Sequence, residues 1–241
     1  MKKILITGSS KGIGKACTLK LLGEGYQIIG IARTHEKFNH YYPYHIDLAA
    51  MHLLESHFKK IAAEHPDIQA IVCSAGYGQF VELEQFSYAQ MQAILNVNFL
   101  SQALLIKTFL PMLKKTAQAK IILLGSECAL EGQKKGSMYC ASKFALRGFA
   151  QSLQQECRSS NLAITLINSG MVRTTFFDEL DFQPGNEEGN AILPEQIAET
   201  ISMLLKLENN CVMQEINCQP MKKVLQKNVR VSKLNKITTE D

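Results

Sequence analysis

Short, unbroken apolar runs alternate with helical segments along most of this 241-residue chain. The first run, 2–7, leads into a helical pattern over 12–24, and a second run follows at 27–32. Unbroken apolar runs are typical of strands buried on both faces, as in a parallel sheet that helices cover on each side. The sequence therefore predicts an α/β fold: a doubly wound, Rossmann-like parallel sheet of about seven strands.

The same patterns place the remaining elements and suggest one domain. We expect residues 1–220 to form that domain and 221–241 to form a basic C-terminal tail. Residues 174–193 form a polar, glycine-containing stretch, and Pro194 stands at the first position of a helix that runs to about 207. Further strands are expected at 42–46, 68–73, 121–124, 162–167 and 211–216, and further helices at 50–63, 88–115 and 137–158.

The positive charge of the chain is concentrated at its end. The net charge is +4, and residues 221–241 alone contain six bases and two acids. The rest of the chain is balanced, which argues against nucleic acid or a membrane surface as a partner. A solvated terminus is the simpler interpretation of the tail.

Cysteine and histidine patterns exclude several other classes. The seven cysteines form no C-x-x-C pair, and the six histidines, all between 35 and 65, have no metal-ligand spacing, so we expect no metal site. The N-terminal apolar run stops at Gly8, too short for a signal peptide, and we expect no stretch long enough to span a membrane. A cytoplasmic location is the resulting expectation.

A glycine-rich loop joins the first strand to the first helix. Glycines let the chain turn tightly and approach a pyrophosphate, and the helix that follows offers free N–H groups and a positive dipole end. This strand–loop–helix context favours a dinucleotide site over a merely tight turn. The predicted phosphate loop comprises Gly8, Ser9, Ser10, Lys11, Gly12, Ile13 and Gly14.

The end of the second strand indicates which dinucleotide binds. NAD-binding strands usually end in a carboxylate that holds the ribose 2′-hydroxyl, but this strand ends in Arg33 and Thr34. A guanidinium can bind a 2′-phosphate, and Lys11 lies on the same side. These residues favour NADP(H) as the cofactor.

Taken together, the ordered motifs resemble those of the short-chain dehydrogenase/reductase family over residues 3–216. Each motif falls at a predicted element boundary. They are TGSSKGIG at 7–14, Asp47 with Leu48 after the third strand, Ser74-Ala75-Gly76 after the fourth, Asn98 in NVNFLS, Ser126 ending the fifth, Tyr139 and Lys143 in YCASK, and SGMVRT at 169–174.

The resemblance implies roles for these residues. Asn98, Ser126, Tyr139 and Lys143 would be catalytic, with Asn98 positioning a water that links Lys143 to solvent. It also implies cofactor contacts and pairing of the helices near 88–115 and 137–158 across a two-fold axis, hence a homodimer or homotetramer. The implied cofactor contacts include the adenine at Asp47 and Leu48, the ribose at Tyr139 and Lys143, the carboxamide at Val172 and Thr174, and the loops at Ser74, Ala75, Gly76 and Gly170.

Three departures from the family pattern stand out. Ser74 replaces the asparagine of N-A-G, and Ser169 replaces the proline of P-G. The C-terminal QEINCQP also lacks the glycine pair that many members show near their last strand. Neither position 74 nor position 169 carries the chemistry in the family, so these two replacements put loop rigidity more in question than activity.

The residues themselves suggest how a hydride-transfer site would work. Tyr139 and Lys143 lie four apart on one helix face, and a nearby ammonium lowers the pKa of a phenol from about 10. Tyr139 can then exchange a proton with a carbonyl or hydroxyl oxygen, which Ser126 also holds. We therefore expect an oxidoreductase acting on a small carbonyl or alcohol.

Two other functions remain open at this level: a cofactor-binding regulator with a vestigial site, and an NADP(H)-using epimerase or dehydratase. The substrate is not readable. We expect its pocket to be apolar and covered by a mobile lid over 174–193, whose glycines could act as hinges. Expected lining residues are Phe176, Phe177 and Phe182 from the lid, with residues near Tyr77, Phe80, Cys128 and Leu130.

Overall fold

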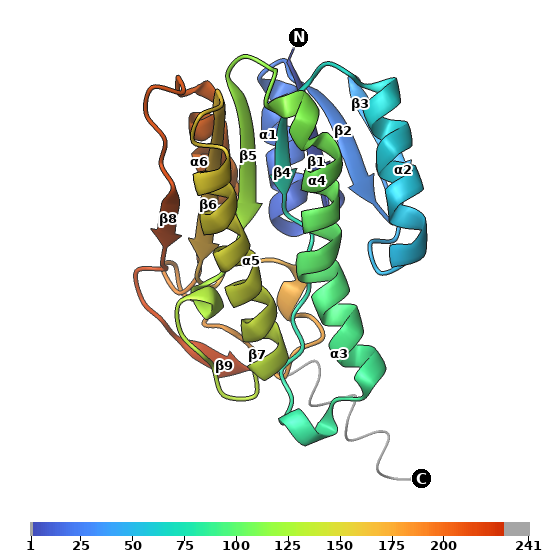
Figure 1. Cartoon of the computed structure of the whole chain (residues 1–241). Coiled ribbons are helices and arrows are strands. Elements are labelled where there is room, and N and C mark those ends of the chain that lie inside the picture. The colour runs from blue at the N-terminus through green and yellow to red at the C-terminus, as the bar shows by residue number, and fades with distance from the viewer. Residues whose placement is uncertain (1, 229–241) are drawn as a thin grey trace.

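Seven strands lie side by side in the order β3-β2-β1-β4-β5-β6-β8, and every neighbouring pair is parallel. The structure is a computed structural model and describes residues 2–228. It confirms the predicted doubly wound sheet (Figure 1). The unbroken apolar runs became its central strands; β5 and β6 are buried along their whole length. The strands are β1 (Lys3–Thr7), β2 (Gln27–Ala32), β3 (Tyr41–His45), β4 (Ile68–Cys73), β5 (Ala119–Leu124), β6 (Leu162–Ser169) and β8 (Glu215–Cys218).

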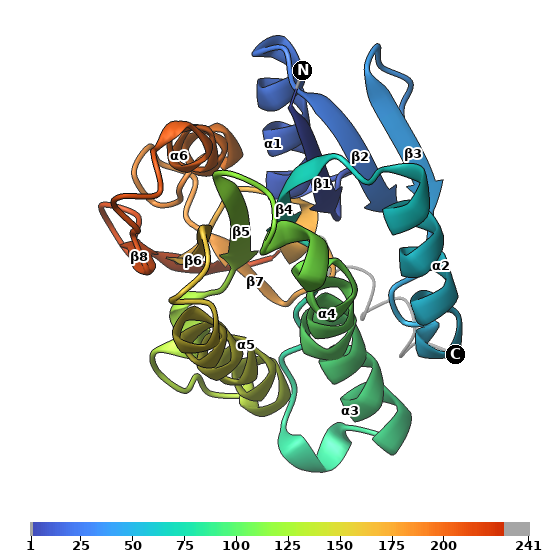
Figure 2. The ribbon, with the colours of Figure 1, turned by 45° about the horizontal axis from the view of Figure 1, so that its top comes forward.

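Helices cover both faces of the sheet and bury a hydrophobic core on each side. Figure 2 shows α1 and α6 on one face, with α2, α4 and α5 on the other. Strand order reverses between β1 and β4, the position at which ligands bind to open α/β sheets. The helices are α1 (Gly12–Gly23), α2 (Met51–Glu64), α3 (Tyr88–Leu95), α4 (Ser101–Leu113), α5 (Ser137–Glu156) and α6 (Pro194–Lys206), with short turns η1 (Leu83–Gln85), η3 (Glu127–Ala129) and η4 (Thr175–Phe177).

The predicted helix over 88–115 contains a widened turn. A π-helical turn, η2 (Asn96–Leu100), joins α3 to α4, and the Ser101 hydroxyl donates to the Val97 carbonyl at 2.9 Å. Such turns are frequent at functional sites, and this one contains Asn98. Apolar periodicity does not reveal the extra residue, because the helix continues on either side of it.

The expectation that no stretch could span a membrane was wrong for this same segment. Tyr88–Leu113 is long and apolar enough to do so by length and composition. In the structure its apolar side chains Leu105, Ile106 and Phe109 pack into the core beneath the sheet. A core helix passes the same length-and-composition test, so the segment is weak evidence for a membrane.

The last predicted strand lies later in the chain than expected. The sequence placed it at 211–216, but β8 begins at Glu215, because its ladder starts where Glu215 pairs with Leu166 of β6. Val212 and Met213, which gave the apolar signal, are about 40% exposed.

A small second sheet joins two segments that the sequence did not predict to be strands. β7 (Phe182–Pro184) lies in the predicted lid, β9 (Leu225–Lys227) lies in the predicted tail, and the two pair antiparallel. Both lie near the carboxyl ends of the main strands (Figure 1). The remainder of the predicted tail, 229–241, is outside the described residues.

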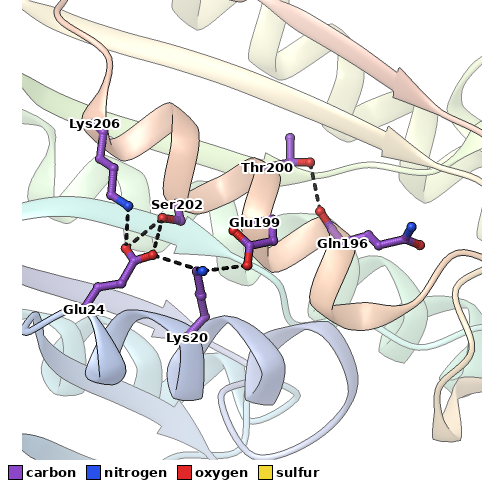
Figure 3. A network of polar contacts seen from close by, with 7 residues as sticks. All are labelled: Lys20, Glu24, Gln196, Glu199, Thr200, Ser202 and Lys206. Carbon is purple, nitrogen blue, oxygen red and sulfur yellow. Dashed lines mark hydrogen bonds and ion pairs between the residues drawn. The ribbon is translucent and has the colours of Figure 1, made fainter.

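An ion-pair network fixes α1, the helix that follows the phosphate loop, against α6. The Glu24 carboxylate accepts hydrogen bonds from the Ser202 hydroxyl at 2.7 and 2.9 Å and pairs with Lys20 at 3.2 Å and Lys206 at 3.1 Å (Figure 3). Burial by itself raises the pKa of Glu24, but Ser202, Lys206 and Lys20 together outweigh it and hold the pKa below its usual value.

Candidate functional site

Glycine is required at several positions of the loop between β1 and α1. Gly8 and Gly12 have φ values of +70° and +51°, which favour glycine. A Cβ on Gly14 would lie 2.2 Å from the Gly8 carbonyl oxygen, so α1 can approach the loop only at a glycine. The loop therefore has the tight geometry that the motif predicted, with Ser10 half-buried in the turn, Lys11 exposed at the N-cap of α1 and Ile13 in the first turn of α1.

Thr7 ties this loop to the next one along the sheet. Its Oγ1 accepts hydrogen bonds from the backbone N–H groups of Ser74 and Ala75, each at 3.1 Å, and donates to Gln102 Oε1 at 3.0 Å. Because the backbone makes this tie, serine in place of the family's asparagine at position 74 leaves it intact. Sequence reasoning missed Thr7 and Gln102, since neither stands out from the core pattern.

A second tie, also missed, runs from the phosphate loop to the start of β3 and the segment that follows β2. The buried Ser9 hydroxyl lies 2.8 Å from the Tyr41 hydroxyl, which also contacts His35 Nδ1. The Tyr41 ring occupies the space beside Gly30, where a Cβ would lie 2.1 Å from its hydroxyl oxygen. These contacts join segments that only the sheet brings together.

The predicted adenine-side residues lie at the ends of β2 and β3. Arg33 and Thr34 are exposed immediately after β2, and Lys11 is exposed at the start of α1. After β3, the Asp47 carboxylate accepts a hydrogen bond from the Ala49 N–H at 2.9 Å, and Leu48 is buried. Two bases, Arg33 and Lys11, are thus exposed at the two positions where the sequence predicted contacts with a 2′-phosphate.

Asn98 is fully buried in the π-helical turn. Its amide donates to the Tyr77 carbonyl at 2.9 Å and to the Ser142 hydroxyl at 3.0 Å, and its Oδ1 accepts from the Tyr77 N–H at 3.0 Å. A Cβ on Gly76 would lie 3.2 Å from this Oδ1 and 3.6 Å from Lys143 Nζ. Asn98 therefore joins the loop after β4 to α5 beside the lysine.

Ser126, Tyr139 and Lys143 meet at the carboxyl end of β5. The Ser126 hydroxyl lies close enough to the Tyr139 phenol for hydrogen bonding to lower the pKa of that phenol, and Ser126 Oγ accepts a hydrogen bond from the Cys128 N–H at 3.1 Å. One helical turn after Tyr139, Lys143 Nζ donates to the Leu124 carbonyl at 2.9 Å and lies 5.8 Å from the Tyr139 ring centre. The three predicted catalytic residues are thus adjacent.

Burial dominates the electrostatics of this group. Desolvation raises the pKa of the Tyr139 phenol, with the Cys128 thiol adding to the effect and the Ser126 hydrogen bond opposing it. Desolvation also lowers the pKa of Lys143 to about 8. The expected lowering of the Tyr139 pKa by Lys143 is therefore outweighed by burial, and Tyr139 is a neutral phenol that can donate a proton.

A cavity of about 560 Å³ opens over these residues. Its cofactor-side wall includes Ile13, Ser74 and Gly76, together with the carboxyl end of β6 and the turn that follows β6. Thr174 lies 3.4 Å from where a Cβ on Gly12 would be, so that turn covers the phosphate loop. The further predicted cofactor residues that line the cavity are Tyr139, Lys143, Gly170, Val172 and Thr174, with Ser169 in place of proline beside them.

The opposite wall is aromatic, as expected for a substrate pocket. Phe80, Cys128, Phe176, Phe177 and Phe182 all line the cavity. Tyr77 and Leu130 themselves are not part of the lining, but residues near them are, among them Gly76 and Gln133.

Sequence reasoning missed a group of residues on this wall. They come from the loop before α5 and from β9 with its preceding turn, and nothing in their local pattern indicates a site. The missed lining residues are Gln133, Lys134, Lys135, Lys223, Leu225, Gln226 and Lys227. Within residues 2–228, no cluster of three or more His, Cys, Asp or Glu side chains could hold a metal ion.

Comparison with known proteins places this site in a family. A model of the short chain dehydrogenase family matches residues 2–184. The 3-oxoacyl-[acyl-carrier-protein] reductase FabG of Buchnera aphidicola is 28% identical over 184 residues, which cover 73% of this chain and 75% of that protein. An uncharacterized oxidoreductase of Schizosaccharomyces pombe is 29% identical over 177 residues, and the match spans 71% of this chain but only 61% of that protein.

Solved structures share the whole architecture. An alcohol dehydrogenase from Thermococcus sibiricus, complexed with 5-hydroxy-NADP, superposes with a TM-score of 0.79 at 25% identity, covering 95% of this chain and 97% of the other. The family match extends over β1 to β7 and includes the glycine loop, the π-helical turn and the Ser126–Tyr139–Lys143 group. This chain belongs to the short-chain dehydrogenase/reductase family.

Proposed function

We propose that this protein is an NADP(H)-dependent oxidoreductase that transfers hydride between the nicotinamide and a carbonyl or alcohol carbon, with Tyr139 as general acid/base. The observation that carries the proposal is the contact of Ser126 with Tyr139, with Lys143 one turn away, inside a cavity that continues to the phosphate loop. The side chains for acid–base chemistry and the cradle for a dinucleotide are therefore parts of one site.

The residues present fit a dinucleotide. Gly14 admits α1 against Gly8, leaving the N-terminus of α1 open toward the loop, where it can bind a pyrophosphate. NADP(H) is favoured over NAD(H) because Arg33, and no carboxylate, follows β2. The Thermococcus sibiricus relative carries an NADP derivative, which supports the same choice.

Side chains of the protein supply the proton that the substrate oxygen takes up. Bound reduced nicotinamide supplies the hydride. The Ser126 hydroxyl holds the substrate oxygen beside Tyr139, and the neutral Tyr139 phenol donates its proton to that oxygen as negative charge develops. Lys143, still largely protonated at neutral pH, stabilises the phenolate that remains. The aromatic wall excludes water from this exchange.

An absorbance assay tests the proposal and separates its alternatives. NADPH oxidation is followed against a panel of aldehydes, ketones and oxo acids, and NADP⁺ reduction against the matching alcohols. We expect turnover that depends on the carbonyl and is faster with NADPH than with NADH. Tight NADPH binding without turnover on any substrate would favour a regulator with a vestigial site. Product formation without net cofactor oxidation would favour an epimerase or dehydratase.

We also propose that the protein assembles as a homodimer or homotetramer. Leu100 at the end of η2 and Phe144 on α5 are 43% and 44% exposed, large apolar side chains on the two helices expected to pair. Light scattering at micromolar concentration tests this, and a monomer there would contradict it.

A further inference from the structure

The substrate side of the cavity carries charged side chains that the proposed chemistry does not use. Basic residues outnumber acidic ones, and they come from two separate segments: the loop before α5, and the chain around β9. The basic lining residues are Lys134, Lys135, Lys223 and Lys227, and the acidic ones are Glu127 and Asp181.

The first pair of lysines is anchored close to the proposed proton donor. The backbone N–H of Gln133 hydrogen-bonds to Sγ of Cys140, the residue after Tyr139, at 3.3 Å. The loop that carries Lys134 and Lys135 is therefore fixed against α5, on the aromatic side of the cavity and away from the phosphate loop.

The second segment crosses the same side. Lys227 in β9 pairs with Phe182 in β7. The Phe182 ring lies 5.0 Å from the Phe80 ring, which lies 5.2 Å from the Tyr139 ring. A continuous apolar path thus leads from the reacting oxygen at Tyr139 outward to the strand that carries Lys227.

One of the four lysines already has a partner. Lys223 pairs with Glu127 at 2.8 Å. Within residues 2–228, Lys134, Lys135 and Lys227 form no ion pair, and all three are exposed. Among the described residues, Asp181 is the only other acid in the lining. The outer end of an apolar pocket therefore has a net positive charge and ammonium groups free to meet an anion.

We propose that the substrates of this site are carbonyl or alcohol compounds with an apolar body and an anionic group at the end remote from the reacting carbon. This inference rests on the proposed function. The aromatic wall takes up the apolar body, and lysine side chains reach along apolar surface to place their charge at its edge. A carboxylate and a phosphate ester share the required chemistry, since both accept charge-assisted hydrogen bonds from ammonium groups.

A matched substrate series tests the proposal. Each compound in the series carries an aldehyde at one end of an alkyl chain of graded length. The other end carries a methyl group, a methyl ester, a carboxylate or a phosphate monoester. At a suitable chain length we expect kcat/KM for one of the anionic forms to exceed that of its neutral counterparts by about 10-fold or more. The gain should lie in KM, since the contact is remote from the reacting carbon, and should shrink as salt is added. Comparison of carboxylate with phosphate identifies the favoured anion.

Variants that change the charge of the cavity lining test which residues cause the preference for anionic substrates. Lys134→Gln with Lys135→Gln, and separately Lys227→Gln, should reduce kcat/KM for the anionic aldehyde far more than for the neutral one. Asp181→Asn should change it in the opposite direction, because it removes a negative charge from the same lining. Lys222→Gln is the matched control, an exposed lysine of the same segment that does not line the cavity.

The outcomes separate this inference from the function beneath it. Equal turnover of neutral and anionic aldehydes, or a preference that the lysine variants leave unchanged, would overturn the anion site and leave the oxidoreductase intact. Failure to oxidise NADPH with any aldehyde in the series and with any carbonyl of the wider panel, together with failure to reduce NADP⁺ with the matching alcohols, would overturn both.

Discussion

Asn98 holds both backbone polar groups of Tyr77, donating to its carbonyl and accepting from its N–H. This pairing sets the loop after β4 beside the catalytic group. Asn98→Ala would leave both Tyr77 groups and the Ser142 hydroxyl short of a partner. Because unpaired buried polar groups are costly, we expect a loss of roughly 2–4 kcal/mol in the free energy of unfolding, measured in urea. Asn96→Ala in the same π-helical turn is the control, and an equal loss there would refute a specific role for Asn98.

Tyr139→Phe keeps the buried ring and removes the hydroxyl that contacts Ser126. We expect NADPH to bind normally while turnover falls by at least ~100-fold, the usual scale for an acid–base group. Steady-state kinetics and a binding titration measure the two effects. Tyr77→Phe removes a hydroxyl outside the cavity lining and should leave turnover nearly intact. Near-normal turnover of the Tyr139 variant would remove Tyr139 from the mechanism.

Arg33→Ala tests the choice of cofactor. Only NADPH carries a 2′-phosphate, so the variant should weaken binding of NADPH far more than binding of NADH. Dissociation constants from nicotinamide fluorescence give the comparison, with Lys37→Ala as an exposed control a few residues away. An equal loss for both cofactors would make Arg33 structural, and a preference of the unmodified protein for NADH would contradict the assignment.

Lys143→Met should stabilise the protein while it abolishes turnover. Burial lowers the pKa of Lys143 from 10.5 to about 8, so the folded state releases this proton more readily than the unfolded state. The penalty is fully present below pH 8 and is relieved as pH rises toward 10.5. Such a shift corresponds to at most about 3 kcal/mol, and loss of the Leu124 hydrogen bond offsets about 1 kcal/mol.

Urea unfolding at pH 7 and pH 9.5 checks the sign. The methionine variant should be the more stable protein at pH 7, and its advantage should shrink at pH 9.5. Lys107→Met, which removes an exposed amine from α4, should show no such pH dependence. A methionine variant that is less stable at pH 7 would refute the proposed cost of burying Lys143.

The segment 174–193 is predicted to close over bound substrate. Phe177 and Leu180 are buried, β7 pairs with β9, and Arg173 donates to the Gly185 carbonyl at 2.8 Å. Closure would therefore involve β9 together with the lid. We expect hydrogen exchange over 174–193 and 225–227 to slow when NADPH and a reducible carbonyl are both present. Full protection in the free protein, unchanged on binding, would exclude a lid.

The parts of this molecule that the sequence predicted depend on local physics. Buried parallel strands need unbroken apolar runs, and these gave the sheet and most element positions. The positive φ at Gly8 and the close approach of Gly14 to the Gly8 carbonyl exclude larger residues on steric grounds. The phosphate loop can therefore be predicted from the sequence. Tyr139 and Lys143 share a helix face because they are four residues apart.

Tertiary structure decided what lies between distant segments. The ties from Thr7 to Ser74 and from Ser9 to Tyr41 exist only because the order of strands in the sheet places these segments together. Burial, which no sequence pattern measures, raised the pKa of Tyr139 where the neighbouring lysine was expected to lower it. The sequence assigned Leu225–Lys227 to the tail because three residues are too few to show the periodicity of a strand. It became part of the cavity wall because β7, far earlier in the chain, offered backbone groups with which it could pair.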